Sequence, residues 1–272
     1  MADERERWAL ILGASSGFGE AAALALAKDG YHIAGVHLDR RSGMRHVDEI
    51  CSRIRALGRE AHFFNVNAAD DDQRAGVLRS IHERFDQTES AGGHAYVRVL
   101  LHSLAFGTLK PFLAADAANA ISRKNMEMTL DVMANSLVYW AQDLVRERFI
   151  EAGSHIYAMT SEGSSRVVES YGAVSAAKAA LESHCRQLAT ELARLGMGAT
   201  CNAIRAGVTM THALMQIPEH DALVREAGRR NPSGRLTTTE DVARAIVTLS
   251  CEGTEWMTGN VLGIDGGEFV TG

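Results

Sequence analysis

Short apolar runs alternate with longer stretches of helical periodicity along the chain. The apolar runs predict buried strands at residues 8–13, 31–37, 61–66, 97–103, 155–160, 199–204 and 261–264. The stretches between them predict helices at residues 18–28, 45–57, 71–85, 125–151, 171–195 and 239–251. Because strands and helices alternate, the sequence predicts an α/β fold, with a doubly wound seven-stranded parallel sheet covered by helices on both faces.

Length and composition limit the domain count and the classes of function. The chain has 272 residues, of which 46% are apolar, and this suits one domain spanning residues 1–272. A net charge of −6 argues against a nucleic-acid partner, and no apolar run approaches the roughly 18 residues that a membrane span needs. The polar N-terminus lacks the apolar stretch of a signal peptide, and the four cysteines are far apart. We therefore expect a cytoplasmic protein with free thiols. The eleven histidines show no ligand spacing, so no metal site is expected.

A glycine-rich segment, Gly13-Ala14-Ser15-Ser16-Gly17-Phe18-Gly19, joins the first predicted strand to the first predicted helix. At such a junction the amides of the helix N-terminus can bind a dinucleotide pyrophosphate. Gly13 permits a sharp turn, Gly17 lets the backbone approach the phosphates, and Gly19 lets the helix pack on the sheet. This pattern is typical of the cofactor end of a Rossmann-type fold, and an ordinary strand–helix turn is the alternative.

The end of the second predicted strand bears on the choice of cofactor. His37 stands at the strand tip, with Arg40 and Arg41 just beyond it, and cations there favour the 2′-phosphate of NADP(H). Asp39 leaves NAD(H) as the alternative, since an acidic residue there would bind the two ribose hydroxyls. The two arginines would otherwise be a solvated helix entry. Asn65 and Val66, at the end of the third strand, are placed to receive the adenine.

Tyr171 and Lys178 stand seven residues apart at the start of a predicted helix. Seven residues make almost two turns, so both side chains share one face, roughly 10 Å apart along the axis. A lysine there can hold a nicotinamide ribose and lend positive charge to a phenol that donates a proton or a hydrogen bond. A packed ring and a solvated amine are the ordinary alternative.

These segments together resemble the short-chain dehydrogenase/reductase superfamily over nearly the whole chain. The glycine segment fits, and so do residues 231–235, 241–243 and 258–267 near the end. Two features depart from its usual members. Those carry the tyrosine four residues before the lysine, where this chain has Val174. They also carry an Asn-Asn-Ala-Gly segment after the fourth strand, where this chain has residues 101–107, with the sequence Leu-His-Ser-Leu-Ala-Phe-Gly.

Both departures are similar to the enoyl-thioester reductases of bacterial fatty-acid synthesis. Ser161 stands seventeen positions before Lys178, where the best-known branch has a second tyrosine and a smaller NADPH-using branch keeps serine. This chain resembles that smaller branch more. Asn135 matches the helix asparagine of a proton-relay water chain in ordinary superfamily members. The segment 206–211 replaces the usual Pro-Gly start of a substrate loop.

The resemblance implies NADPH-dependent reduction of the C2–C3 double bond of a 2-enoyl thioester carried by acyl-carrier protein or CoA. Tyr171 would hydrogen-bond the enolate oxygen, Lys178 would hold the ribose, Ser161 would assist at the carbonyl or nicotinamide, and Asn135 would relay protons. The remaining cofactor contacts would come from Ser103, Leu104, Gly207, Val208 and Thr211. Ser161 as a strand-end hydroxyl, Asn135 as a structural amide and His102 as a satisfied core histidine are the alternatives.

The segment near residues 208–232 is expected to form a substrate lid. Its apolar positions, Leu214, Met215, Ile217 and Leu223, line an acyl tunnel or only seal the lid on the core. Its arginines, Arg225, Arg229 and Arg230, would meet an acidic carrier protein or a CoA phosphate, or are solvated. Residues 108–124 would add a second lid or an oligomer contact. The resemblance implies a homotetramer, with residues 132–145 as an apolar interface.

Two rival functions remain open at the level of sequence. One is a carbonyl reductase or alcohol dehydrogenase of the same superfamily, with Ser161 and Tyr171 as its usual pair. The other is a nucleotide-binding protein without turnover. A comparison of crotonyl-CoA with acetoacetyl-CoA as substrates separates the three.

Overall fold

One seven-stranded sheet, parallel throughout, organises the computed structural model, which describes residues 5–218 and 220–271. Its strands, in chain order, are β1 (Arg5–Leu12), β2 (His32–His37), β3 (Ala61–Asn65), β4 (His94–His102), β5 (His155–Thr160), β6 (Thr200–Ala206) and β7 (Val261–Ile264). They lie side by side in the order β3-β2-β1-β4-β5-β6-β7. The predicted doubly wound sheet is confirmed. Residues 1–4, 219 and 272, part of the predicted polar N-terminus, lid and C-terminal end, lie outside the described residues.

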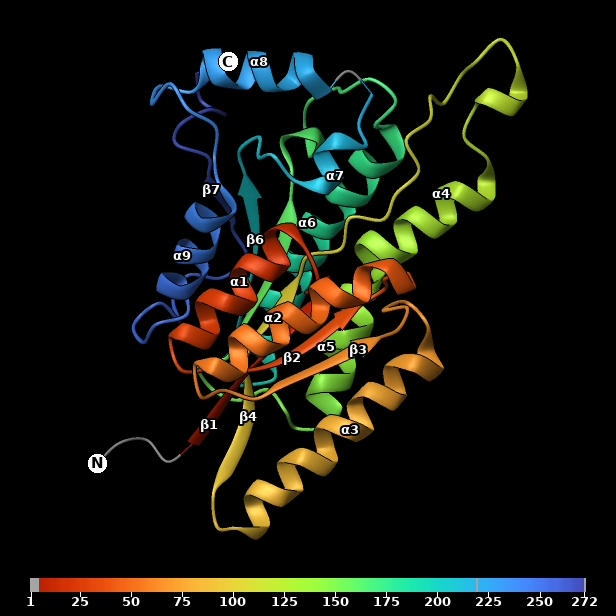
Figure 1. Ribbon diagram of the computed structural model, residues 1–272. Coiled ribbons are helices and arrows are strands. Elements are labelled where there is room, and N and C mark those ends of the chain that lie inside the picture. Colours follow the sequence, from red (N-terminus) through yellow and green to blue (C-terminus); the bar gives the residue numbers. More distant parts are fainter. Residues whose placement is uncertain (1–4, 219, 272) are drawn as a thin grey trace.

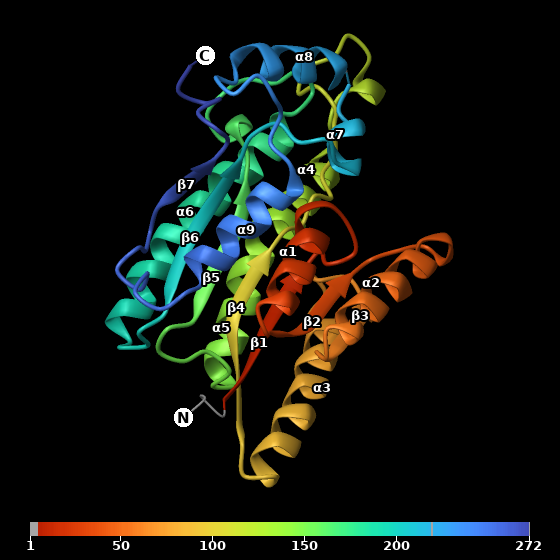
Figure 2. The same ribbon diagram turned by 60° about the vertical axis from the view of Figure 1, so that its left-hand side comes forward.

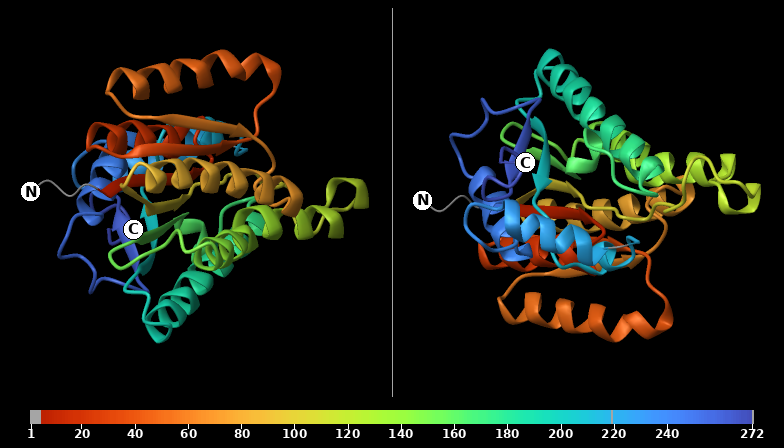
Figure 3. Two further views of the ribbon diagram at one scale, coloured as in Figure 1. Left: turned by 90° about the horizontal axis from the view of Figure 1, so that it is seen from below. Right: turned by 90° about the horizontal axis from the view of Figure 1, so that it is seen from above.

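Helices cover both faces of the sheet, and Figure 3 shows the three layers. The longer helices are α1 (Gly17–Lys28), α2 (Met44–Ala56), α3 (Asp71–Ser90), α4 (Arg123–Leu130), α5 (Ser136–Arg146), α6 (Gly172–Arg194), α8 (His220–Arg230) and α9 (Thr239–Leu249). Short turns are η1 (Arg41–Gly43), η2 (Ala117–Asn119), η3 (Asp131–Asn135), η4 (Glu162–Ser164) and α7 (His212–Met215). Helices α1, α2 and α9 pack on one face, and α3, α5 and α6 on the other (Figures 1 and 2).

Alternation along each strand divides the core into two clusters. Ile11 of β1 and Val99 of β4 face the α1–α2–α9 layer, whereas Leu10 and Leu100 face the α3–α5–α6 layer. Trp140 of α5 is fully buried in the second cluster, and its indole Nε1 donates to the Ala68 carbonyl at 2.8 Å. Burial of such a ring favours folding by roughly 2–3 kcal/mol, since its one polar atom keeps a partner.

Strands β1 and β4 both begin earlier than predicted. Arg5 pairs with His94, and Tyr96 pairs with Arg7, before the apolar runs at residues 8 and 97 begin. These added residues at the amino ends of the strands include charged side chains, which pair with residues of neighbouring elements. Glu6 accepts from Arg84 of α3 at 3.0 Å, for example. Apolar patterning cannot detect a strand of this kind, because its side chains are charged.

The single helix predicted over residues 125–151 is wrong. The structure has α4, then the π-helical turn η3, then α5, which ends at Arg146. The chain leaves the helix at Glu147, and Arg148 adopts a φ of +58°, which no helix continues. The other predicted elements are present, with ends shifted by a few residues.

The carboxyl ends of all seven strands meet at one edge of the sheet. The chain runs outward from β1 to β3 and then returns to add β4 on the other side of β1, so a crevice opens between β1 and β4. Helices α7 and α8 lie over this edge in Figures 1 and 2. The segment between β4 and α4 extends away from the body as an arm that carries η2 (Figure 1).

Candidate active site

The glycine segment after β1 makes a turn so tight that only glycine fits at two of its positions. Gly13 has a φ of +89°, and a Cβ on it would lie 2.5 Å from the Ser103 carbonyl oxygen. A Cβ on Gly19 would lie 2.0 Å from the Gly13 carbonyl oxygen, so α1 can meet the loop this closely only with glycine there. Ser16 is the N-cap residue of α1, and its hydroxyl makes no capping hydrogen bond. The Ser16 side chain therefore leaves the first amides of α1 uncapped, as a pyrophosphate site at this helix N-terminus would require.

The other residues of the segment complete the loop. Ser15 and Ser16 precede Gly17, and Phe18, which follows it, packs on the core from a partly buried position. Across the crevice, the Thr211 methyl group would lie 3.6 Å from a Cβ on Gly17. The segment after β6 thus reaches the glycine loop, and the two could enclose a dinucleotide between them.

The tips of β2 and β3 are linked by a polar cluster. His37 is buried, and its Nδ1 lies 2.9 Å from an Asp39 carboxylate oxygen. Asn65 accepts from the Asp39 amide and donates to the Asp39 carbonyl, both at 3.0 Å. The Val66 amide donates to the His37 carbonyl at 2.8 Å. Asp39 is therefore held by His37 and Asn65.

Arg40 and Arg41 are exposed at the same tip. Among the described residues no ion pair engages either guanidinium, whereas the neighbouring Arg45 pairs with Glu49 at 3.2 Å. The two side chains remain available to an anionic group of a ligand at this tip.

Tyr171 stands at the N-cap of α6, at the carboxyl edge of the sheet. Its ring packs against Gly163 in the turn after β5, which also carries Ser161. Burial raises the pKa of the Tyr171 phenol, and side-chain hydrogen bonding with Ser161 opposes this rise. The Ser161 hydroxyl accepts from the Gly163 amide at 3.2 Å, so its proton is free to be donated. The structure thus brings Tyr171 and Ser161 together.

Lys178 is buried on the same side of α6. Its Nζ donates to the Met159 carbonyl at 2.6 Å and to the Leu104 carbonyl at 3.4 Å. Burial lowers the pKa of this amine to about 8, although Glu182 on the next turn raises it. The amine therefore lies between the ends of β4 and β5, next to Ser103 and Leu104, and close to losing its proton under physiological conditions.

Asn135 lies at the end of η3, and its side-chain oxygen is 3.2 Å from Nε2 of His184 on α6. Within residues 5–218 and 220–271 no hydrogen bond joins it to Tyr171, Ser161 or Lys178. The structure therefore places it with His184 rather than with those three. A proton path from Asn135 would need intervening groups.

The alternative that His102 is a core histidine with its hydrogen bonds made holds for only one of its two ring nitrogens. Nε2 lies 2.9 Å from the Ser136 hydroxyl, which itself donates to the Val132 carbonyl at 2.8 Å, so Nε2 carries the hydrogen. Nδ1 is buried without a partner. Burial, and secondarily Lys178, lower the pKa of His102 to about 3, so the ring is neutral.

The predicted availability of Arg230 to a carrier protein or CoA phosphate is corrected by the structure, whereas Arg229 remains 75% exposed. Arg229 pairs with Glu226 at 2.8 Å on the exposed side of α8. Arg230 is largely buried and pairs with Glu162 at 3.1 Å and with Glu268 at 3.3 Å. Sequence reasoning missed both glutamates. Glu162 follows Ser161 directly, and that adjacency was the available signal.

A third residue that the sequence analysis missed is Phe112, in the arm between β4 and α4. Its ring packs against the backbone of Gly172, the residue after Tyr171, and yet it remains 54% exposed. Phe112 therefore stands at the mouth of the site, on the segment expected to form a second lid or an oligomer contact.

No described helix has the length and apolar character to cross a membrane. The described residues include no group of three or more potential metal ligands, and the four cysteines are free thiols.

Comparisons with known proteins agree with this geometry. The family model described as Enoyl-(Acyl carrier protein) reductase matches residues 13–268. The NADH enoyl-(acyl-carrier-protein) reductase FabI of Neisseria meningitidis is 28% identical over 227 residues, covering 82% of each chain. An NADPH-dependent aldehyde reductase-like chloroplastic protein of Arabidopsis thaliana is 26% identical, over 96% of this chain and 93% of its own.

Among solved structures, the NADH enoyl-(acyl-carrier-protein) reductase of Aquifex aeolicus superposes with a TM-score of 0.81. The match covers 98% of this chain and 97% of that one at 24% identity, which shows a shared fold. Since the family model spans nearly the whole chain, including the crevice and the Tyr171–Lys178 helix, the protein belongs to the enoyl-(acyl carrier protein) reductase family of short-chain dehydrogenase/reductases.

Proposed function

We propose that the protein reduces the C2–C3 double bond of a 2-enoyl thioester with a nicotinamide dinucleotide, with Tyr171 as the hydrogen-bond donor to the thioester oxygen. The observation that carries the proposal is the position of this phenol. It lies at the very start of α6, beside Ser161 and nearly two turns from Lys178. Val174, where ordinary superfamily members carry their tyrosine, is 4% exposed in the hydrophobic core.

The chemistry explains why this displacement suits an enoyl substrate. In carbonyl reduction, hydride arrives at the carbon that bears the oxygen, so the donor must sit one bond away from that carbon. In enoyl reduction, hydride arrives at C3 while negative charge develops on the thioester oxygen, several bonds away. A donor shifted along the helix serves the second arrangement. One pre-positioned donor is worth about 3–4 kcal/mol of barrier.

The turn between β1 and α1 suits a dinucleotide site, because Gly13 and Gly19 allow the tight strand–helix junction and Ser16 leaves the first amides of α1 without a side-chain cap. The segment 13–19 would hold the pyrophosphate, and Asn65 and Val66 the adenine. The bound dinucleotide supplies hydride. Lys178 would hold the nicotinamide ribose, while Ser103, Leu104, Gly207, Val208 and Thr211 would enclose the nicotinamide.

Tyr171 donates its hydrogen bond to the developing enolate oxygen, and Ser161 orients the phenol through its free hydroxyl proton. The positive charge of Lys178 stabilises the same oxygen at longer range. The proton that reaches C2 comes from Tyr171 or from a water relayed past Asn135. Arm residue Phe112 and the lid at residues 208–232 would exclude solvent from these steps.

The function is tested by incubating the protein with NADPH or NADH and, separately, crotonyl-CoA and acetoacetyl-CoA. We expect loss of absorbance at the nicotinamide band with crotonyl-CoA, at a rate at least tenfold above that with acetoacetyl-CoA. Oxidation with the keto substrate alone would support the carbonyl reductase alternative, which the name of the Arabidopsis relative favours. Dinucleotide binding with no turnover of any thioester would support the non-catalytic alternative.

The cofactor is proposed to be NADP(H) in preference to NAD(H), although the Neisseria relative is named for NADH. The Asp39 carboxylate is engaged by His37, and Asp39 is further held by Asn65, while Arg40 and Arg41 are exposed and uncommitted. Cations at this tip would bind the 2′-phosphate.

Replacing Arg40 and Arg41 together by alanine is expected to weaken NADPH binding by 10- to 100-fold and NADH binding by less than twofold. The estimate follows from about 1.5–3 kcal/mol for a hydrogen bond to a charged group. Titration of each dinucleotide by fluorescence measures both constants. Arg45→Ala, on the exposed side of α2, is the matched control. Equal loss for the two dinucleotides would show that the arginines do not contact the 2′-phosphate.

The acyl group would be delivered on acyl-carrier protein or CoA, in keeping with the family and with a role in fatty-acid synthesis. Arg225, exposed on α8, is the lid arginine for which no ion pair is seen among the described residues. A homotetramer remains part of the proposal, but the predicted apolar interface at residues 132–145 is corrected by the structure, because its large apolar side chains Leu137, Trp140 and Leu144 are buried in the core of this chain.

A further inference from the structure

Three buried charges meet beneath the lid, at a place that the proposed reaction does not use directly. Arg230, at the end of α8, donates through Nη2 to both Glu162 oxygens at 3.1 and 3.2 Å. The same nitrogen donates to Glu268 at 3.3 Å. The side chains of Arg230, Glu162 and Glu268 are 12%, 19% and 3% exposed. Charges this deep are retained only with good partners, so the three form one unit.

Each member of this unit comes from a different part of the site. Glu162 follows Ser161 in the turn after β5, and Arg230 ends the longest helix of the lid. Glu268 accepts from the Val208 amide through both carboxylate oxygens, at 3.4 and 3.3 Å. Val208 begins the segment that leads from β6 into the lid. The unit therefore joins the strand end that carries Ser161 to both ends of the lid.

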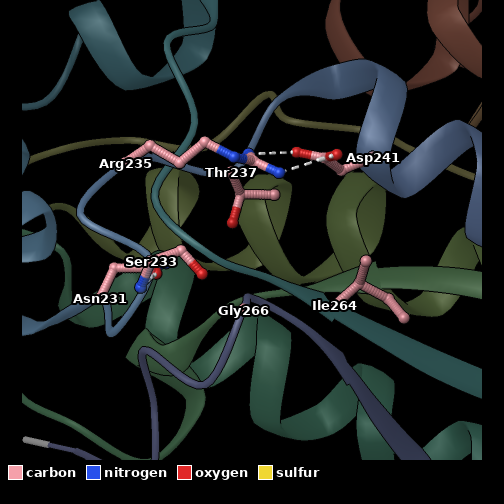
Figure 4. Close-up of a pocket in the computed structure, with 7 residues that line it drawn as sticks. All are labelled: Asn231, Ser233, Arg235, Thr237, Asp241, Ile264 and Gly266. Carbon is pink, nitrogen blue, oxygen red and sulfur yellow. Dashed lines mark hydrogen bonds and ion pairs between the residues drawn. The ribbon is translucent and has the colours of Figure 1, made fainter.

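The C-terminal segment that carries Glu268 is itself tied to the end of α8. Asn231 donates to the Asp265 carbonyl at 2.9 Å, and Figure 4 shows Asn231 beside Gly266 at the edge of a small polar cavity. The Thr271 hydroxyl donates to the Arg230 carbonyl at 2.7 Å. The guanidinium of Arg205, on β6, lies 3.6 Å from the centre of the Phe269 ring. These contacts fix Glu268 to the strand end and the lid alike.

We propose that Glu268 and Arg230 are positioning residues, which hold the Val208 segment and the Ser161 turn in the arrangement that binds the nicotinamide end of the dinucleotide. The role rests on the proposed function. It acts through the Val208 amide and Glu162, because neither Glu268 nor Arg230 needs to contact the substrate. Without Glu268, the Val208 amide loses its acceptor and Arg230 keeps only one of its two carboxylates.

The test uses the full chain with Arg230→Gln, Glu268→Ala and the milder variants Arg230→Lys and Glu268→Gln. Arg229→Gln is the matched control, since Arg229 is the preceding residue on α8 and pairs only with exposed Glu226 among its described neighbours. Amide hydrogen exchange is followed in the free protein over residues 207–217. NADPH binding is titrated, and kcat and KM are measured with crotonyl-CoA.

We expect exchange over residues 207–217 to quicken at least tenfold in Arg230→Gln and Glu268→Ala, and NADPH binding to weaken at least tenfold. Core strands β1 and β4 should keep their exchange rates. Arg230→Lys and Glu268→Gln, which retain a donor or an acceptor, should restore both quantities to within threefold of the parent protein. Arg229→Gln should change neither by as much as twofold.

Unchanged exchange and NADPH binding in folded Arg230→Gln and Glu268→Ala would overturn the proposal. So would a loss that the milder variants do not recover, or one that Arg229→Gln shares. If the two severe variants do not fold, the milder pair decides, because Arg230→Lys and Glu268→Gln should then still differ from the control by two- to threefold. If the parent protein does not turn over crotonyl-CoA, the proposed function is wrong. The positioning role of Glu268 and Arg230 is still tested, because exchange and NADPH binding are measured without a thioester.

Discussion

Replacing Tyr171 with phenylalanine is expected to lower kcat for reduction of crotonyl-CoA by 100- to 1,000-fold, with dinucleotide binding changed by less than twofold. In the proposed mechanism the phenol donates to the thioester oxygen as charge develops there, and loss of one such donor costs about 3–4 kcal/mol of barrier. Its ring, packed against Gly163, is retained by phenylalanine, so the fold should not suffer. Steady-state kinetics and NADPH titration on the same preparation give both numbers.

Tyr139→Phe is the control for this experiment. Tyr139 lies on α5, and its hydroxyl donates to Asp131 at 3.0 Å, away from Ser161 and Lys178. The same chemical change there should leave kcat within twofold. If Tyr171→Phe kept more than a third of the parent kcat, the phenol would not be the donor, and the proposed mechanism would be wrong even though the family assignment stands.

Activity is expected to fall as the pH is raised through about 8, because Lys178 then loses its charge. Burial lowers the pKa of this amine to about 8 from the 10.5 of a free lysine. The charged form, which would hold the ribose in the proposed mechanism, predominates below pH 8, and the neutral form predominates above it. The descending limb should appear in kcat/KM, which reports groups of the free enzyme. Lys178→Met should remove the limb and weaken NADPH binding by 10- to 100-fold.

As the pH rises above about 8, the contribution of Lys178 to folding stability should increase while the activity falls. Since the folded-state pKa of Lys178 is lowered, the unfolded chain binds more protons between about pH 8 and the pKa of 10.5, and the contribution of Lys178 to stability rises with pH there. Denaturant unfolding of the parent protein and Lys178→Met at pH 7.5 and 10 measures this contribution as the difference between the two proteins. If the parent protein lost both its activity and this stability contribution as the pH rose, unfolding rather than deprotonation of Lys178 would explain the fall in activity.

The sequence predicted those features that depend on local pattern. Apolar runs such as residues 8–13 and 155–160 located the strands, and Gly13 and Gly19 located the turn where β1 meets α1. Ser161 follows the predicted strand at residues 155–160 and Tyr171 opens the next predicted helix, which places both at the edge where parallel strands end. Each of these inferences uses residues near one another in the chain or a rule of sheet topology.

Features set by distant partners were not predicted. Arg5 and Arg7 belong to β1 because β4 pairs with them, and Arg84 of α3 pairs with Glu6 between them. The charged sequence of this segment gives no sign of these distant partners. Glu268 is buried because Arg230 and the Val208 amide meet it, whereas a glutamate in a glycine-rich C-terminal segment is by default exposed. Asn135 was placed by analogy, and its contact with His184 depends on how η3 and α6 pack.

The π-helical turn at residues 131–135 bears on where this part of the chain tolerates a deletion. This wider turn takes up one residue more than an α-helical turn, whereas deleting a residue from the regular turns of α4 would rotate all of α5 by about 100° relative to the start of α4. Trp140 and Leu137 would then swing out of the interior, and Ser136 would part from His102. Substitutions on the exposed surface of α4 and α5 are therefore compatible with this packing, whereas a change in the number of residues in their regular turns is not.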